Sequence, residues 1–327
     1  MNHTPTTQNA WIPAPDSAEP LPLRQVKGNT WVAEGVELVP FYKLDDTRCI
    51  LLDSGLVSER DRLEAALLGA GLTPVGILCS HAHVDHCGNN GYFQEKYRLP
   101  VALTAPEAGM CSGLLNLKCY FLTLPPSIVA RESTCMIHTP DVIIPSVDGP
   151  FSFLGVEFGI LQTPGHSAGH IAIITPDNVC YTADALLSRE NLGAKLPYNL
   201  SQSLANASRE KLKGLGCDKY IMAHRGVCGP EDVDALVDTN RELIDRRTQE
   251  ILDLVDHPMT ASEIGHAACV LHKLFTSRPH RALRFERNVR FFIEHLVDEG
   301  LLEMICHEGV ILYRKAGSAD GGGESHG

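Results

Sequence analysis

The chain has 327 residues, of which 44% are hydrophobic and 21% charged, and its formal net charge is −12. This composition is typical of a soluble globular protein, and the length favours one large domain joined to a small one. The acidic balance excludes general binding of polyanions, so a nucleic-acid role would need a local basic patch.

The cysteines and the chain ends indicate the redox environment and the absence of a secretory signal. Eleven cysteines are scattered without a CxxC pair, which favours reduced thiols in a cytoplasmic protein over a disulfide framework. Residues 1–25 are proline-rich and lack the regions of a secretory signal, so we predict an extended arm there and a disordered tail at 317–327. No apolar run reaches about 18 residues, so we predict no membrane contact.

Strand-like and helical runs alternate over the catalytic region that we predict at 26–257. Apolar runs at 30–44 and 48–55 predict strands, and a helix is predicted to begin at Ser58 and to bury Leu63, Leu67 and Leu68. A short strand at 75–79 then leads into the segment that carries most of the chemistry. Further predicted strands and helices follow at 89–99 (helix), 100–105 (strand), 156–165 (strand), 170–184 (strands), 201–215 (helix, capped by Ser201) and 219–226 (strand).

Two regions depart from that alternation. Residues 111–140 show no clean period, and we interpret them as a long excursion over the active face. After a long charged helix, a capping box at 260–263, an apolar helical face over 285–297 and a hairpin over 301–314 follow. This order predicts a small winged-helix-like domain at 258–316.

Four potential metal ligands gather directly after the 75–79 strand. The stretch CSHAHVDHCG contains His81, His83, Asp85 and His86. Imidazole and carboxylate are the usual ligands of zinc and of neighbouring first-row ions. Residues two apart on a tight loop can bind one ion while the next pair faces a second.

Two such sites need more ligands, and separate strand ends supply them. His166, Asp184 and His224 each follow a predicted strand, and Asp53 ends an earlier one. Each of these alone is more often a turn or cap residue. As an ordered set, they predict a binuclear centre.

With these ligands, the sequence resembles the metallo-β-lactamase superfamily, whose signature is HxHxDH followed by a histidine, an aspartate and a histidine. The resemblance spans about residues 28–230. It implies an α+β fold, an αββα sandwich with the metals at one edge. It also implies that His81, His83 and His166 bind one ion, that Asp85, His86 and His224 bind the other, that Asp184 bridges both, and that Asp53 supports the ligands from behind.

Three neighbours of these ligands have ordinary alternatives. His170 could face substrate, but a buried structural histidine is the simpler interpretation. Cys87, beside His86, is interpreted as a buried neighbour. Arg225, directly after His224, either contacts an anionic substrate or joins a surface ion pair.

The resemblance implies metal-assisted hydrolysis with two divalent ions, most simply zinc, with iron or manganese as alternatives. Asp85 and Asp184 would orient the attacking water and take up its proton. We predict a small ester, thioester or lactone as substrate. Antibiotic hydrolysis is disfavoured because the zinc β-lactamases commonly carry cysteine where this chain has Asp184, and the glutathione-binding region of the glyoxalase II thioesterases is not recognisable. A single-iron persulfide dioxygenase would use a subset of these ligands.

The C-terminal domain raises a second hypothesis. Residues 273–290 carry six Lys or Arg against Glu286, and the order of elements resembles the lactamase-beta-2-like group, some members of which cleave single-stranded RNA. This basic segment predicts either a nucleic-acid contact, making the protein a single-strand RNA or DNA endonuclease, or a lid or homodimer pad over the site. The arginines wind around a helix without stacking aromatics, which disfavours the first. A non-catalytic DNA-binding regulator would not need the intact ligand set.

Overall fold

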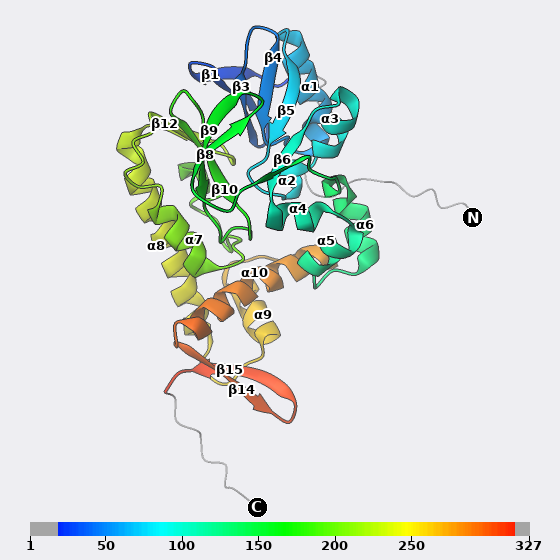
Figure 1. Cartoon of the computed structure of the whole chain (residues 1–327). Coiled ribbons are helices and arrows are strands. Elements are labelled where there is room, and N and C mark those ends of the chain that lie inside the picture. Colours follow the sequence, from blue (N-terminus) through cyan, green and yellow to red (C-terminus); the bar gives the residue numbers. More distant parts are fainter. Residues whose placement is uncertain (1–18, 318–327) are drawn as a thin grey trace, which may run out of the picture.

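The computed structural model describes residues 19–317, and its main body is two facing sheets with helices on their outer sides (Figure 1). The predicted αββα sandwich is therefore confirmed. The first sheet has the order β1 (Leu23–Lys27), β2 (Thr30–Glu34), β3 (Leu38–Lys43), β4 (Arg48–Leu52), β5 (Thr73–Leu78), β6 (Val101–Thr104) and β7 (Val142–Ile144). The second has the order β13 (Gly226–Cys228), β12 (Lys219–Met222), β11 (Val179–Ala183), β10 (Ile171–Ile174), β9 (Val156–Gln162) and β8 (Gly149–Phe153).

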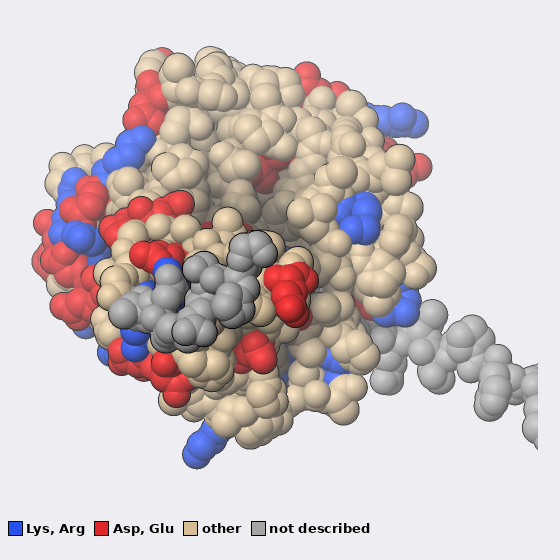
Figure 2. All heavy atoms as spheres, turned by 90° about the horizontal axis from the view of Figure 1, so that it is seen from below, with Lys and Arg blue, Asp and Glu red and all other residues tan. Residues whose placement is uncertain are grey.

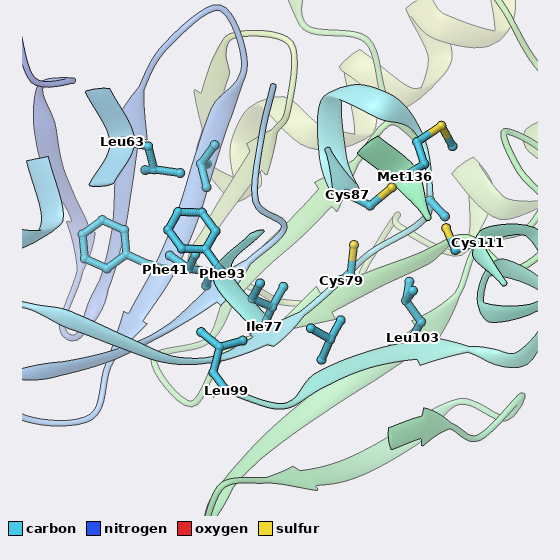
Figure 3. Close-up of a cluster of buried hydrophobic side chains, with 14 of the residues drawn as sticks. Phe41, Leu63, Ile77, Cys79, Cys87, Phe93, Leu99, Leu103, Cys111 and Met136 are labelled. Carbon is cyan, nitrogen blue, oxygen red and sulfur yellow. The ribbon is translucent and has the colours of Figure 1, made fainter. Parts of the chain in front are cut away.

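Strand residues alternate between two cores because successive side chains point to opposite faces of a sheet. In β4, Ile50 and Leu52 join the core between the sheets, whereas Cys49 and Leu51 face the outer core under the helices. Figure 3 shows part of that outer core, where Cys79 and Cys87 point inward among apolar side chains. Burying each large apolar side chain contributes about 1.5–3 kcal/mol, which fixes the strands that carry the site.

Helices cover both outer faces. α1 (Arg60–Gly69) and α3 (Asn90–Tyr97) pack on the first sheet, and α8 (Pro230–Leu254) packs on the second. The remaining helices of this body are α2 (Val84–Cys87), α4 (Ala105–Cys111), α5 (Leu114–Tyr120), α6 (Pro126–Ser133) and α7 (Gln202–Glu210). Ser201 caps α7 as predicted, since its side chain accepts the amide N–H of Leu204.

Two details of the first helix were predicted wrongly. Ser58 is not its N-cap, because a 3₁₀ turn over Val57–Glu59 precedes the helix and Glu59 occupies the cap position. Leu68 is 49% exposed, whereas Leu63 and Leu67 are buried, since Leu68 lies a further 100° around the helix from Leu67.

The segment without a clean period is helical and lies over the site. Within the predicted excursion, α5, α6 and a 3₁₀ turn form between residues 114 and 136, and Tyr120, Phe121 and residues 131–135 line the cavity at the predicted ligands. These helices are too short to show a sustained hydrophobic period, so the sequence pattern did not predict them.

The C-terminal part has the predicted sequence of elements, α9 (Ala261–Leu271), α10 (Pro279–Asp298), β14 (Leu302–His307) and β15 (Val310–Lys315). Thr260 and Glu263 form the predicted capping box. Val289, Phe292 and Leu296 of α10 share a buried core with the second half of α8. In Figure 1, α10 runs beneath the two sheets between α7 and α5.

The remaining expectations concern the ends and the membrane. Residues 1–18 of the predicted arm and 318–327 of the predicted tail lie outside the described residues, and β1 already begins within the stretch assigned to the arm. All eleven cysteines are free thiols. Within residues 19–317, no helix has both the length and the apolarity that crossing a bilayer requires.

Candidate metal centre

The predicted ligands meet at one edge of the sandwich because the strands that carry them end there. β4 and β5 run parallel in one sheet, as do β11 and β12 in the other, so their carboxyl ends coincide. The predicted site residues lie as follows: Asp53 after β4, His81 and His83 after β5, Asp85 and His86 in α2, His166 after β9, Asp184 after β11 and His224 after β12.

One group brings together His81, His83, His166 and Asp184. Nδ1 of His83 lies 3.0 Å from Nε2 of His81 and 2.9 Å from Nε2 of His166. Oδ2 of Asp184 lies 3.2 Å from that same His166 nitrogen. Three imidazole nitrogens and a carboxylate oxygen therefore face a common point.

The other group brings together Asp85, His86, His224 and the same Asp184. Oδ2 of Asp184 lies 3.2 Å from Nε2 of His224 and 3.5 Å from Nε2 of His86. Oδ2 of Asp85 lies 3.8 Å from the His224 nitrogen. Asp184 thus stands between the two groups, which is where the resemblance put a bridging carboxylate.

Asp184 is held in place by its own backbone and by a buried histidine. Ala183, just before it, has φ 45°, a sharp exit from β11 that turns the aspartate toward the edge. Nε2 of His170 accepts the amide N–H of Asp184 at 3.3 Å, and its Nδ1 bonds Thr163 at 2.8 Å. His170 is therefore the structural histidine of the simpler interpretation.

Each converging imidazole has a partner on its other ring nitrogen, and such partners fix ring orientation and tautomer in metal sites. Nδ1 of His81 contacts the Ser80 hydroxyl at 3.0 Å, and Nε2 of His83 contacts the Tyr120 hydroxyl. Nδ1 of His166 lies 3.2 Å from the carbonyl oxygen of Tyr198.

The second group is backed by carboxylates. Oδ2 of Asp53 lies 2.7 Å from Nδ1 of His86 and accepts the hydroxyls of Ser80 and Tyr181, each at 2.6 Å. Oε2 of Glu37 lies 2.6 Å from Nδ1 of His224. Asp53 is therefore where a supporting carboxylate was expected, whereas Glu37 and Tyr120 were not found from the sequence.

The pKa values of histidines in the two groups shift in opposite directions. Burial, together with the neighbouring histidines, holds the pKa of His81 well below its usual range. Burial also works to lower the pKa of His86, but Asp184, Asp85 and Asp53 outweigh it and raise that pKa. Burial opposes ionisation of Asp184, yet His224, His86 and His166 hold its pKa well below the usual value. A neutral imidazole such as His81 and the ionised carboxylate of Asp184 are both suited to bind divalent cations.

The donor set passes a further test for bound cations. Nε2 of His86 and Oδ1 of Asp184 are buried and make no hydrogen bond within residues 19–317. Buried polar atoms are costly unless paired, and both belong to the ligand groups just described. The residues present therefore fit two metal ions.

A cavity of about 470 Å³ opens onto the cluster. Its walls include His83, Asp85, His166, Asp184 and His224, together with Tyr120, Tyr198, Arg131, Arg284 and Arg287. Cys87 is fully buried and outside these walls, as expected. Arg225 is exposed with φ 58° and does not line the cavity.

Residues 32–224 match the family model described as "Metallo-beta-lactamase superfamily". The chain belongs to the metallo-beta-lactamase superfamily. Members of this superfamily are metal-dependent hydrolases, so the predicted enzyme class is confirmed.

Curated relatives of this superfamily member are hydrolases. A probable metallo-hydrolase of Bacillus subtilis is 25% identical over 57% of this chain and 83% of its own length. A hydroxyacylglutathione hydrolase of Mesorhizobium japonicum is 27% identical over 62% of this chain and 69% of its own. An N-acyl homoserine lactonase of Bacillus cereus is 27% identical over 48% of this chain, which spans only 58% of the lactonase.

Solved structures of the superfamily share the fold over most of the chain. A metallo-beta-lactamase family protein of Thermus thermophilus superposes with a TM-score of 0.64 and 22% identity over 85% of this chain and 93% of its own. A beta-lactamase domain protein of Burkholderia ambifaria gives a TM-score of 0.66 and 17% identity over 93% and 96%. At these identities the likeness concerns the fold alone.

Proposed function

We propose that this chain is a two-metal hydrolase of small esters, thioesters or lactones. The observation that carries the proposal is Asp184, whose carboxylate lies between two groups of converging donors. His81, His83 and His166 would bind one ion, and Asp85, His86 and His224 would bind the other. Zinc suits these ligands best, and metal analysis would distinguish it from iron or manganese.

A pair of bound divalent ions would lower the pKa of water and polarise a carbonyl oxygen. The chain's own residues would direct the proton and the substrate. Asp184, which belongs to both groups of converging side chains, would help to orient the attacking water. The Asp85 side chain is 23% exposed on the cavity wall, where it can accept the released proton.

The size and walls of the cavity favour a small-molecule substrate. A volume of about 470 Å³ is within the range of small-ligand sites. The hydroxyacylglutathione hydrolase and the lactonase among the relatives act, by their names, on a thioester-type and a lactone-type substrate. Both reactions add water to a carbonyl, which is the chemistry that this arrangement would support.

Turnover by metal-loaded protein tests the proposal. One arm contains thioesters and lactones, and the other contains single-stranded RNA and an activated phosphodiester. His83→Ala is the blank, and His257→Ala, an exposed histidine far along the chain, is the matched control. Turnover of the first arm that is lost only in His83→Ala supports the proposal. RNA cleavage alone would favour the endonuclease, and silence in both arms with two metals bound would contradict hydrolysis of either class.

We also propose that 26–257 form the catalytic domain and that 258–316 form a winged-helix-like domain of the lactamase-beta-2-like kind, acting as a lid. Two helices and a hairpin in that order support this domain, and the core that α10 shares with α8 would hold it against the catalytic domain. Hydrogen exchange measures the division. Opening of 258–316 at lower free energy than β4 and β5 would support two domains, and one common opening would contradict them.

A further inference from the structure

We propose that Arg287, with Arg284 one turn before it, forms an anion-binding subsite beside the metal centre. The substrate would then carry a carboxylate or phosphate close to the bond that is cleaved. This inference rests on the proposed function and narrows its substrate class.

The two arginines reach the cavity because α10 is fixed across its mouth. Residues three apart share a helix face, so both side chains point the same way. The side-chain amide of Asn288 donates to the carbonyl oxygen of Leu196 at 3.0 Å. The Ser203 hydroxyl lies 3.0 Å from Nδ1 of His295. These bonds tie α10 to the loop and helix that follow β11, so this wall is held firmly against the catalytic domain.

A short chain of rings connects Arg287 to the metal ligands. Its guanidinium carbon lies 4.5 Å from the ring centre of Tyr198. That ring lies 5.4 Å from His83 and 5.2 Å from His166, centre to centre. The Tyr198 and Tyr120 hydroxyls are 2.6 Å apart. Only one aromatic ring therefore separates the guanidinium from two ligand histidines, a distance that a small substrate can span.

The charge of Arg287 lacks a carboxylate partner. Its hydrogen bonds to the adjacent Asn288 are long, 3.3 and 3.4 Å, and no ion pair within residues 19–317 includes it. One turn further on, Arg290 differs, since it lies 3.2 Å from Glu286. On the facing wall, Arg131 is paired with Glu132 at 2.7 Å. Arg287 thus has the donor fork of a carboxylate or phosphate site and no acid to occupy it.

Arg284 adds a second positive charge to the same wall. Burial, and then the neighbouring Arg287, lower the pKa of Arg284 to about 9, whereas the nearby carboxylates of Asp85 and Glu132 act to raise it. Arg284 and Arg287 line the same cavity, so an anion bound beside Arg287 would also be attracted by the charge of Arg284. The subsite therefore favours a ligand anion over a neutral group of the same shape.

The position of these arginines favours a small anionic ligand over nucleic acid as the partner of the basic segment 273–290. Arg284 and Arg287 line the cavity at the metal cluster and not an open surface. On the face that Figure 2 shows, Lys and Arg lie in small separate groups and acidic side chains crowd the side of α8. A long polyanion would meet those acids, whereas a small anionic substrate would not.

Matched esters test the subsite. The probes are mono(4-nitrophenyl) glutarate and its neutral methyl ester, which release the same leaving group. We expect wild-type protein to prefer the anionic ester in kcat/KM by about tenfold or more, because hydrogen bonds between charged groups are strong. In Arg287→Gln, that preference falls toward one. Arg287→Lys keeps part of it, and Arg290→Gln, which removes the same charge from the same helix outside the cavity, keeps all of it.

Two further experiments distinguish failure of the anion-binding subsite from failure of the proposed hydrolysis. A phosphonate analogue of the glutarate ester shows whether a phosphate is preferred over a carboxylate. Calorimetry of glutarate and monomethyl glutarate binding to zinc-loaded protein needs no turnover. Tighter glutarate binding that Arg287→Gln abolishes supports the subsite even if no ester is hydrolysed, which would contradict only the proposed function. An equal preference in wild type and Arg287→Gln, in both rates and binding, overturns the subsite.

Discussion

The buried Glu37 contacts the partly exposed His224 across the two sheets, with 2.6 Å between Oε2 and Nδ1. The Leu38 amide donates to the Ala223 carbonyl at 2.7 Å, which aligns the start of β3 with the loop that carries His224. Burial lowers the pKa of His224, but Asp184 and Glu37 outweigh it and raise that pKa to about 11. The carboxylate therefore holds the ring and directs its Nε2 toward Asp184.

Glu37→Gln should weaken binding of the ion nearest His224 by about 10- to 100-fold, because a neutral amide holds the imidazole less firmly. Competition titration against a zinc-chelating dye measures this loss. Glu34→Gln, at the end of β2 where the side chain is 37% exposed, should leave both affinities unchanged. Equal affinities in Glu37→Gln and wild type would show that the contact does not support metal binding.

Gly165→Ala should displace His166. Gly165 has φ +123°, and a Cβ there would lie 2.2 Å from the Ala205 backbone nitrogen. The loop must shift against α7, so we expect a loss of about 1–3 kcal/mol in the free energy of unfolding and weaker metal binding. Chemical denaturation and metal titration measure the two effects. Gly109→Ala is the control, since its Cβ would meet nothing within 4 Å. A Gly165→Ala protein as stable as wild type would contradict this account.

Metal removal should lower thermal stability. The His86 and Asp184 atoms that lack hydrogen bonds would stay buried without a ligand. An ion present at a thousand times its Kd contributes about 4 kcal/mol through linkage. Differential scanning calorimetry with and without a chelator measures the shift, and zinc-saturated chelator is the control. Asp184→Asn should show a smaller shift than wild type. A chelator-independent melting temperature in wild type would argue against resident metals.

Glu64→Gln should destabilise the protein near neutral pH but not in acid. Burial opposes ionisation of Glu64, but Lys96 and the hydroxyls of Tyr97 and Tyr92 outweigh it and lower its pKa. A lowered carboxyl pKa adds stability above the unfolded-state pKa, and this is lost as pH falls through the folded-state pKa. We expect a cost of about 1 kcal/mol at neutral pH that disappears in acid.

Urea denaturation at neutral pH and at pH values below the Glu64 pKa measures that difference. Glu95→Gln, exposed on the same helix as Lys96, should have little effect at either pH. A Glu64→Gln cost that persists unchanged in acid would mean that packing, and not charge, is the cause.

The sequence predicted the candidate metal ligands but not the residues that hold their side chains in place. His81, His83, Asp85 and His86 form one short motif, so their spacing alone indicated a metal site. Asp184 and the later histidines follow strands, and strand ends are readable from short apolar runs. These residues converge in the structure as the order of ligands predicted.

The supports could not be read in the same way. Glu37 lies between two strands far from His224 in the chain, and nothing in its local sequence distinguishes it from the acids that lie on the surface. Tyr120 lies in the 111–140 segment, whose helices are too short to leave a period. Leu68 shows the same limit, since a correct helix prediction did not fix which of two adjacent leucines is buried.

The sequence by itself indicated the family, several of the strands and the set of candidate ligands, because the ligand motif and short apolar runs are local patterns. Only the tertiary structure decided that Arg287 faces the metal cavity while Arg290 pairs with Glu286 on the outside. Both arginines belong to one basic helix, and the distinction arises from how α10 packs against the body. That packing depends on contacts between residues far apart in the chain, which no local pattern encodes.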